Sequence, residues 1–218
     1  MGILDLIGRY RNTDKSSVLH GYLEKYEKYL PFNRSDRIKI LEIGVLDGGS
    51  LKTWSDYFFK AKVVGIDINP DCKLHEANMI SVEIGSQTDD DFLDTVISKY
   101  QQFDFILDDG SHINKDVIHT FYRLFPYLKS GGVYIVEDTC TSYWKDYGGG
   151  IGDGTMIEFF KGIIDEVNFF GELVDSETPH SRNDSALLER FSIFSDSYIG
   201  TQIESINFLN SIIIITKR

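Results

Sequence analysis

The stretch IESINFLNSIIIITK, residues 203–217, contains two apolar runs separated by little more than Asn210 and Ser211. Each run is about as long as a strand, and so short a connection favours an antiparallel hairpin. A membrane-spanning helix needs about 20 apolar residues, so SIIIIT at 211–216 is interpreted as a buried strand. The chain is therefore expected to end in a hairpin that is appended to a larger sheet.

Upstream of this hairpin, five short apolar runs alternate with stretches that are compatible with helices. The runs are RIKILEIGV at 37–45, KVVGIDI at 62–68, MISVEIG at 79–85, FDFILDD at 103–109 and GVYIVED at 132–138. The helix-compatible stretches are 49–60, 71–77, 88–100 and 113–128. Alternation of this kind implies right-handed crossovers and a mainly parallel sheet. Together with the hairpin it predicts a doubly wound, Rossmann-like α/β fold with seven strands.

We expect a single domain over residues 1–218, because a chain of this length with 42% hydrophobic residues can bury one core and is short for two. Residues 1–36 are expected to form an N-terminal helical cap. One helical stripe there consists of Val18, Tyr22, Tyr26 and Leu30. Residues 139–200 contain a glycine-rich stretch, a helix candidate at 155–170 and a polar segment at 175–185, and are expected to form lid and substrate-binding loops.

The charge and the cysteine content narrow the function classes. A formal net charge of -12 opposes binding to a phosphate backbone, so nucleic acid is not an expected partner. The two cysteines form no CxxC pair and no zinc pattern, which fits a reducing cytoplasm. We find no export or lipidation signal and no membrane span, and the sequence leaves open whether the chain forms a homo-oligomer.

The first predicted strand ends in a turn, EIGVLDGGS at 42–50, that matches a cationic ligand. It does not fit GxGxxG, because Leu46 stands where the second glycine would admit a pyrophosphate. Its acids, Glu42 and Asp47, are unfavourable beside phosphates but suit S-adenosylmethionine, which is a cation without a phosphate. The turn and the closing hairpin therefore favour a methyltransferase over a dehydrogenase. The alternative is a loop that only joins strand to helix.

Two further strand ends are candidate nucleoside contacts. Asp67 ends the second strand and is placed to accept hydrogen bonds from both ribose hydroxyls, a role that an acid plays in either nucleotide-binding class. The turn after the third strand, 85–88, contains Ser86 and Gln87 and is expected near the adenine. A helix N-cap at Ser86 or Thr88 is the equally weighted alternative.

Acids also gather at the ends of the fourth and fifth predicted strands. Asp108, Asp109 and His112 follow one strand, and Glu137 and Asp138 follow the other. Carboxylates that meet at the rim of a sheet repel one another unless a cation or protons intervene, so a divalent ion is expected. All-oxygen ligation points to Mg²⁺, with Mn²⁺ or Ca²⁺ as other occupants. The alternative is that the acids are solvated or cap the next helix.

His112 is the candidate catalytic base. An imidazole near its ordinary pKa can take a proton at neutral pH from a hydroxyl that a metal has polarised. A loop histidine, or a cap for the helix at 113–128, is the alternative.

The sequence resembles the metal-dependent macrolide sugar O-methyltransferases, and more distantly the cephalosporin hydroxylase-like proteins. The similar stretches are NTDKSSVLHGYLEKYE, LEIGVLDGGSLKTW, VVGIDIN, IGSQTDDDFL, FDFILDDGSHI, LFPYLKSGGVYIVEDTCTSYW and INFLNSIIIITK. DDGSHI and GGVYIVED are the specific ones. Thr13-Asp14-Lys15 is similar to the family's N-terminal signature, which folds over the cofactor pocket.

The resemblance implies a class I methyltransferase with Mg²⁺ held by Asp109, Glu137 and Asp138, and His112 as base. The adenosylmethionine contacts that it implies are Glu42, Gly44, Gly48, Gly49, Ser50, Asp67, Ser86, Gln87 and Asp108. A sugar-containing small molecule or glycan as acceptor follows from the resemblance alone. The family's enzymes are longer, and residues 145–200 match them poorly.

The expected function is therefore adenosylmethionine-dependent and Mg²⁺-dependent methylation of a sugar hydroxyl. One rival acts by the same mechanism on a catechol or another small diol, whose adjacent oxygens would chelate the metal equally well. A nicotinamide-dependent oxidoreductase is opposed by the missing GxGxxG. A binding module without turnover would be expected to lose the acids or the histidine, which this chain retains.

Overall fold

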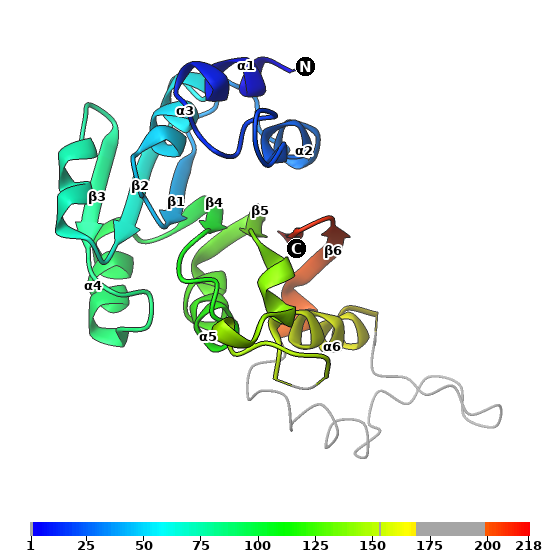
Figure 1. Cartoon of the computed structure of the whole chain (residues 1–218). Helices are drawn as coiled ribbons and strands as arrows, with labels where there is room; N and C mark the ends of the chain where they lie inside the picture. The colour runs from blue at the N-terminus through cyan, green and yellow to red at the C-terminus, as the bar shows by residue number, and fades with distance from the viewer. Residues whose placement is uncertain (1, 153, 169–198) are drawn as a thin grey trace, which may run out of the picture.

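The computed structural model describes residues 2–152, 154–168 and 199–218. Their strands form one seven-stranded sheet in the order β3-β2-β1-β4-β5-β7-β6, with helices on both faces (Figure 1). The predicted doubly wound α/β fold is confirmed. The order reverses between β1 and β4, which is where open α/β sheets bind their ligands.

The strands lie where the apolar runs predict them. They are β1 (Lys39–Ile43), β2 (Lys62–Asp67), β3 (Ile80–Ile84), β4 (Phe103–Asp108), β5 (Leu128–Val136), β6 (Ile203–Leu209) and β7 (Ile212–Lys217). All neighbouring pairs from β3 to β5 are parallel, whereas β7 pairs antiparallel with both β5 and β6. The closing hairpin is thus confirmed, and its second strand is inserted between β5 and the edge strand β6.

Two apolar cores lie on opposite faces of the sheet. One face is covered by α1 (Ile3–Tyr10), α2 (Tyr22–Tyr29) and α3 (Gly49–Tyr57), and the other by α4 (Asp90–Tyr100), α5 (Asn114–Leu124) and α6 (Met156–Asn168) (Figure 1). Strand residues alternate between the two, so that Leu41 enters the core under α4 and α5 while Ile40 enters the core under α1 to α3. This alternation is the two-residue period of a strand that is buried on both faces.

The N-terminal cap differs from its expected form. The helix predicted from the Val18 stripe begins only at Tyr22, because Gly21 adopts φ 66° and starts a new helix there. Val18 lies before that point and is 68% exposed, so its assignment to the stripe was wrong. The structure adds α1, which the periodicity did not indicate. The stretch 71–77 contains only a short 3₁₀ helix, η1 (Pro70–His75).

Part of the predicted lid region can be located. The helix candidate at 155–170 corresponds to α6, and Thr139–Tyr143 and Lys145–Tyr147 form the 3₁₀ helices η3 and η4. The polar segment 175–185 lies outside the described residues. Within the described ranges, no helix has both the length and the apolar character that crossing a membrane requires.

Candidate active site

The carboxyl ends of β1, β4 and β5 meet at one edge of the sheet and place the predicted site residues together. The backbone ladder continues past the strands, since the amide of Asp109 donates to Ile43 (3.0 Å) and that of Glu137 donates to Asp108 (3.0 Å). Asp109 and Glu137, the residues that follow β4 and β5, therefore lie next to the neighbouring strand ends at the edge of the sheet. In this way the parallel register unites acids that are far apart in the sequence.

Gly44 is required by this close approach. Its backbone has φ 89°, and a Cβ atom added there would lie 2.1 Å from the carbonyl oxygen of Asp109. Only glycine combines this left-handed conformation with the space that the neighbouring loop leaves. The first turn is therefore shaped by its packing against the loop after β4, which favours a built site over a simple strand-to-helix connection.

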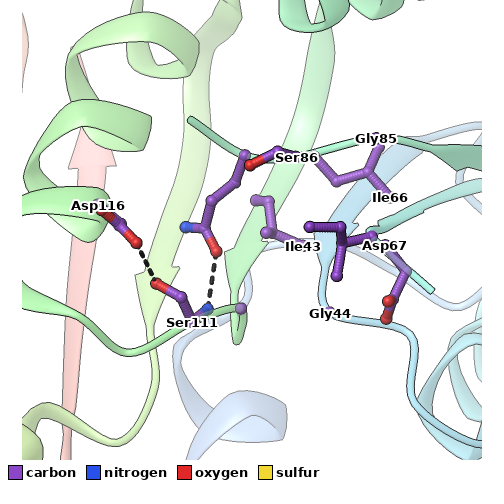
Figure 2. A pocket seen from close by; sticks show the side chains of 11 residues that line it. Ile43, Gly44, Ile66, Asp67, Gly85, Ser86, Ser111 and Asp116 are labelled. Carbon is purple, nitrogen blue, oxygen red and sulfur yellow. Dashed lines mark hydrogen bonds between the residues drawn. The ribbon is translucent and has the colours of Figure 1, made fainter. Parts of the chain in front are cut away.

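A cavity of about 290 Å³ lies at this edge and contains several predicted cofactor contacts. Its lining residues are Ile43, Gly44, Ile66, Asp67, Ile68, Gly85, Ser86, Gln87, Gly110, Ser111 and Asp116. Asp67 stands on one side, while Ser111 and Asp116, which hydrogen bond at 2.9 Å, stand on the other (Figure 2). Acidic and hydroxyl groups thus face a mostly apolar pocket, as expected for a nucleoside site.

Asp67 is fixed by backbone amides. Its Oδ2 accepts from Val45 (2.8 Å) and Leu46 (3.2 Å), and its Oδ1 accepts from Asn69 (2.8 Å). Burial raises the pKa of this carboxyl, but the three amides together outweigh burial and the pKa is lowered. Asp67 is therefore an ionised acceptor at neutral pH, with lone pairs left for a ribose.

Glu42 is completely buried below the first turn. Its Oε2 accepts from the indole Nε1 of Trp54 (2.9 Å), and its Oε1 lies 3.8 Å from Lys15 Nζ. Among the described residues Oε1 has no hydrogen-bond donor within range. Burial raises the pKa of Glu42 to about 7, although Lys15 opposes the shift. An unpartnered buried carboxylate oxygen suits a ligand that carries an amino group.

The remaining predicted cofactor contacts do not line this cavity. Gly48 adopts φ 70° as the N-cap of α3, and Gly49 and Ser50 form the first turn of that helix. Asp108 is 1% exposed and accepts hydrogen bonds from Gln87 and Tyr134 at 3.4 Å each. Burial raises its pKa to about 7. The roles of Gly48, Gly49, Ser50 and Asp108 in holding a cofactor stay predictions.

A second cavity, of about 320 Å³, shares Gly44, Asp67 and Gly110 with the first. Its other lining residues are Asp14, Leu46, Asn69, Cys72, Asp109, His112 and Asp138. His112 Nε2 lies 3.8 Å from Asp109 Oδ1 and 3.8 Å from Asp138 Oδ2. His112 and Asp138 have φ of 57° and 49°, a left-handed conformation that is uncommon for residues other than glycine. The candidate base and two predicted metal ligands are therefore brought together.

This group of side chains fits a divalent cation. One ligand atom each from Asp109, His112 and Asp138 lie within 4.8 Å of one another, and all three residues are partly exposed. Two ligands that are each about 2.0–2.4 Å from one ion lie no more than about 4.8 Å apart, so this separation is compatible with a single bound ion. Asp109 and Asp138 supply the hard oxygen donors that Mg²⁺ and Mn²⁺ take.

Glu137 is placed differently from the other two predicted ligands. It is 2% exposed, its Oε1 accepts from Tyr26 Oη (2.5 Å), and its Oε2 accepts from Lys15 Nζ (2.9 Å). It is not a member of the three-residue group described above. Carboxylate oxygens have spare lone pairs, so its assignment as a ligand stays a prediction.

Lys15 is the buried counterion of this site. Its Nζ donates to Asp109 and Glu137 and also lies near Glu42. Burial lowers the pKa of Lys15, but the charges of Glu137, Asp109 and Glu42 outweigh burial and hold the pKa well above its usual value. Lys15 therefore stays protonated, and its charge offsets part of the repulsion among the three carboxylates.

Comparisons with known proteins show the family to which the chain belongs. The mycinamicin VI 2''-O-methyltransferase of Micromonospora griseorubida is 34% identical over 174 residues, 75% of this chain and 43% of that protein. The L-olivosyl-oleandolide 3-O-methyltransferase of Streptomyces antibioticus is 36% identical over 178 residues, 76% of this chain and 46% of that protein. The chain belongs to the family of the macrolide sugar O-methyltransferases. No family model matches it.

The fold of this chain also matches that of a solved methyltransferase. MycE methyltransferase from the mycinamycin biosynthetic pathway, solved in complex with Mg and SAH, has a TM-score of 0.84 and 28% sequence identity, covering 99% of this chain and 54% of that chain. A second MycE structure also contains mycinamycin VI. The chain spans about half the length of the curated relatives it matches.

Three features of this chain's site do not follow from the sequence patterns. The periodicity predicts only that Tyr22 and Tyr26 share a helical stripe, whereas in the structure their hydroxyls donate to Asp138 and Glu137. Four-residue spacing of two tyrosines in a segment that resembles the family was the available signal. The resemblance to the family's N-terminal signature includes Lys15 but does not indicate its contacts with the acids of the site. Ser111 and Asp116 carried no signal beyond their closeness to DDGSH.

Proposed function

We propose that this chain is the catalytic domain of an S-adenosylmethionine-dependent, Mg²⁺-dependent O-methyltransferase that acts on a sugar hydroxyl. The observation that carries the proposal is the shared wall between two cavities, made by Gly44, Asp67 and Gly110. A methyl donor in the first cavity would thus adjoin an acceptor beside Asp109, His112 and Asp138 in the second.

The residues of the chain divide the reaction between them. Asp67, Ser86 and Gln87 line the donor cavity, and Glu42, which is buried below the first turn, is the proposed partner of the donor's amino group. Asp109 and Asp138 would hold the divalent ion, with Glu137 as the predicted third ligand. When bound, the ion supplies positive charge that lowers the pKa of the acceptor hydroxyl. The products are a methyl ether, S-adenosylhomocysteine and a proton, and His112 Nε2 is placed to take that proton.

A sugar acceptor is supported by the relatives and by aromatic groups beside the base. The curated relatives are named as O-methyltransferases of mycinamicin VI and of L-olivosyl-oleandolide. Near His112, the Tyr147 ring lies 6.5 Å away between centroids, and Trp144 lies 5.8 Å from Tyr147. Trp144 and Tyr143 are about half exposed. Aromatic faces of this kind suit a sugar ring, and we infer that Tyr143 and Trp144 belong to the acceptor pocket.

We propose one domain over residues 1–218, with 1–36 as its cap and 139–200 as lid and substrate-binding loops. We also propose a cytoplasmic location, which the low cysteine content supports. Size measurement by light scattering would show whether the chain forms a homo-oligomer.

Calorimetry with S-adenosylhomocysteine and Mg²⁺, followed by methyl transfer to a panel of glycosides, tests the function. We expect binding of both ligands and turnover that EDTA abolishes. Asp109→Asn should weaken Mg²⁺ binding, and Glu137→Gln should do so if Glu137 is a ligand. His112→Asn should retain both ligands and lose about 10²–10⁴-fold in rate. Undiminished turnover in EDTA would overturn the metal assignment.

The same assay separates the rival functions. Turnover of catechols without turnover of glycosides would favour the small-diol methyltransferase, since both acceptors present adjacent oxygens. Binding of NAD in place of S-adenosylhomocysteine would favour the oxidoreductase. A chain that binds S-adenosylhomocysteine and Mg²⁺ but methylates none of the acceptors would favour the binding module.

A further inference from the structure

Three side chains from the N-terminal segment reach the acids of the cation site. Lys15 comes from the loop between α1 and α2, and Tyr22 and Tyr26 lie one turn apart on α2. Their partners lie 94 to 122 positions away in the sequence. Rings at i and i+4 on a helix share one face, so α2 presents both hydroxyls to the acids after β5.

The contacts divide the oxygens of Asp109 and Asp138 into two sets. Lys15 Nζ binds Oδ2 of Asp109, while Oδ1 of the same residue faces His112 at 3.8 Å. Tyr22 Oη donates to Oδ1 of Asp138 (2.6 Å), while its Oδ2 faces His112 at 3.8 Å. In each acid one oxygen is held by the N-terminal segment and the other faces the cavity that contains His112.

Glu137 connects the holding groups to one another. Its two oxygens accept from Tyr26 and Lys15, and all three side chains are 2% exposed or less. Lys15 is also fixed at its backbone, because its carbonyl oxygen accepts from the amides of Tyr22 (2.9 Å) and Leu23 (3.1 Å) at the start of α2. Lys15 is thus held both at its backbone and at its ammonium group, and it does not line the cavity.

We propose that Lys15, Tyr22 and Tyr26 are positioning residues of the cation site. They hold one oxygen of Asp109 and of Asp138, and both oxygens of Glu137, so that the other oxygens of Asp109 and Asp138 face the cavity and would be available to an ion. The inference rests on the proposed function, because it assumes that Asp109 and Asp138 hold a divalent metal. Groups that orient metal ligands in this way commonly change the affinity for the metal about 10–100-fold.

Mn²⁺ binding, followed by calorimetry and by electron paramagnetic resonance, tests the proposal. Tyr22→Phe removes one hydroxyl with little change in volume and is expected to weaken Mn²⁺ binding about tenfold. Its matched control is Tyr29→Phe, on the same helix, which should bind Mn²⁺ as the wild type does. The wild type and both variants should bind S-adenosylhomocysteine with equal affinity. A general loosening of the fold would instead lower the affinity for Mn²⁺ and for S-adenosylhomocysteine together.

Lys15→Met provides the sharper comparison, with Lys28→Met as the control for loss of a lysine from the same region. We expect at least tenfold weaker Mn²⁺ binding for Lys15→Met, and partial rescue by Lys15→Arg. Tighter binding would show that the ammonium group competes with the metal, which would overturn the proposal. If Lys15→Met does not fold, the tyrosine variants decide.

The outcomes separate this inference from the function on which it rests. A wild-type chain that binds no Mn²⁺ contradicts the metal-dependent function itself. A wild-type chain that binds Mn²⁺, together with Tyr22→Phe and Tyr26→Phe variants of unchanged affinity, contradicts only the positioning role.

Discussion

At the scale of single residues, left-handed conformations shape the site. Gly44, His112 and Asp138 all have positive φ, and each lies at the edge of the second cavity. Such conformations are costly for residues with a Cβ atom and persist where surrounding contacts enforce them. The hydrogen bond from Tyr22 to Asp138 is one such contact. Two residues with a Cβ atom in this costly conformation, His112 and Asp138, thus line the second cavity.

Gly44→Ala tests the close approach of the first turn to Asp109. The added Cβ would meet the Asp109 carbonyl at 2.1 Å, so we expect a loss of more than about 3 kcal/mol in the free energy of unfolding and weakened S-adenosylhomocysteine binding. Gly131→Ala is the matched control, because Gly131 has φ 74° but nothing within 4 Å. Its cost should be about 1–2 kcal/mol, from the backbone conformation alone. Equal costs in urea denaturation would contradict the steric explanation.

At the scale of elements, α1 anchors the loop that contains Lys15. The Asp5 carboxylate accepts from the Ser17 amide (2.7 Å), the Ser17 hydroxyl (2.6 Å) and Arg9 Nε (3.1 Å). Burial raises the pKa of Asp5, but the hydrogen bonds from Ser17 and the charge of Arg9 outweigh burial, and the pKa is lowered. The ionised form therefore stabilises the folded cap.

Asp5→Asn should lower the free energy of unfolding by about 1–3 kcal/mol at neutral pH, because buried donors lose a charged acceptor. A carboxyl with a lowered folded-state pKa stabilises above its unfolded pKa, near 3.9, and loses this effect as the pH falls through the folded value. The difference between wild type and variant should therefore shrink below about pH 4. Asp56→Asn, at the more exposed pair with Arg11, should cost less than about 1 kcal/mol.

At the scale of the whole molecule, the two cores share every central strand. Phe121 on α5 is fully buried, and its ring centroid lies 4.9 Å from Phe125, 5.2 Å from Tyr134 and 5.0 Å from Phe160. These rings join α5, α6 and β5 on the face opposite the N-terminal cap. Loss of packing on one face should reach the other through the sheet.

Phe121→Ala should destabilise the chain by about 3–5 kcal/mol, because it removes a large buried ring. We expect one cooperative transition in denaturant, followed both by far-UV circular dichroism and, in a Trp144→Phe background, by the fluorescence of Trp54, which lies in the opposite core. Phe59→Ala, at a ring that is 57% exposed, serves as control. Separate transitions for the two signals would contradict the coupling.

Local patterns in the sequence were enough to predict the sheet, its closing hairpin and the acids at the strand ends. Strands that are buried on both faces appear as short apolar runs, and the residue after each run necessarily emerges at the sheet's edge. Asp109, Asp138 and His112 could therefore be grouped in advance. The positions of Glu137 and Asp108 could not, because burial and hydrogen-bond partners depend on side chains from other elements.

Only the tertiary structure decided what holds the acids. Lys15 meets Asp109 and Glu137 across 94 and 122 positions of sequence, and the two tyrosines of α2 meet the same group. No periodicity encodes such pairs, since they arise when the segment that contains Lys15 and α2 packs over the sheet's edge. The sequence by itself determined which residues could carry charge at the site, and the packing of the cap determined which of them are neutralised and which oxygens face the cavity.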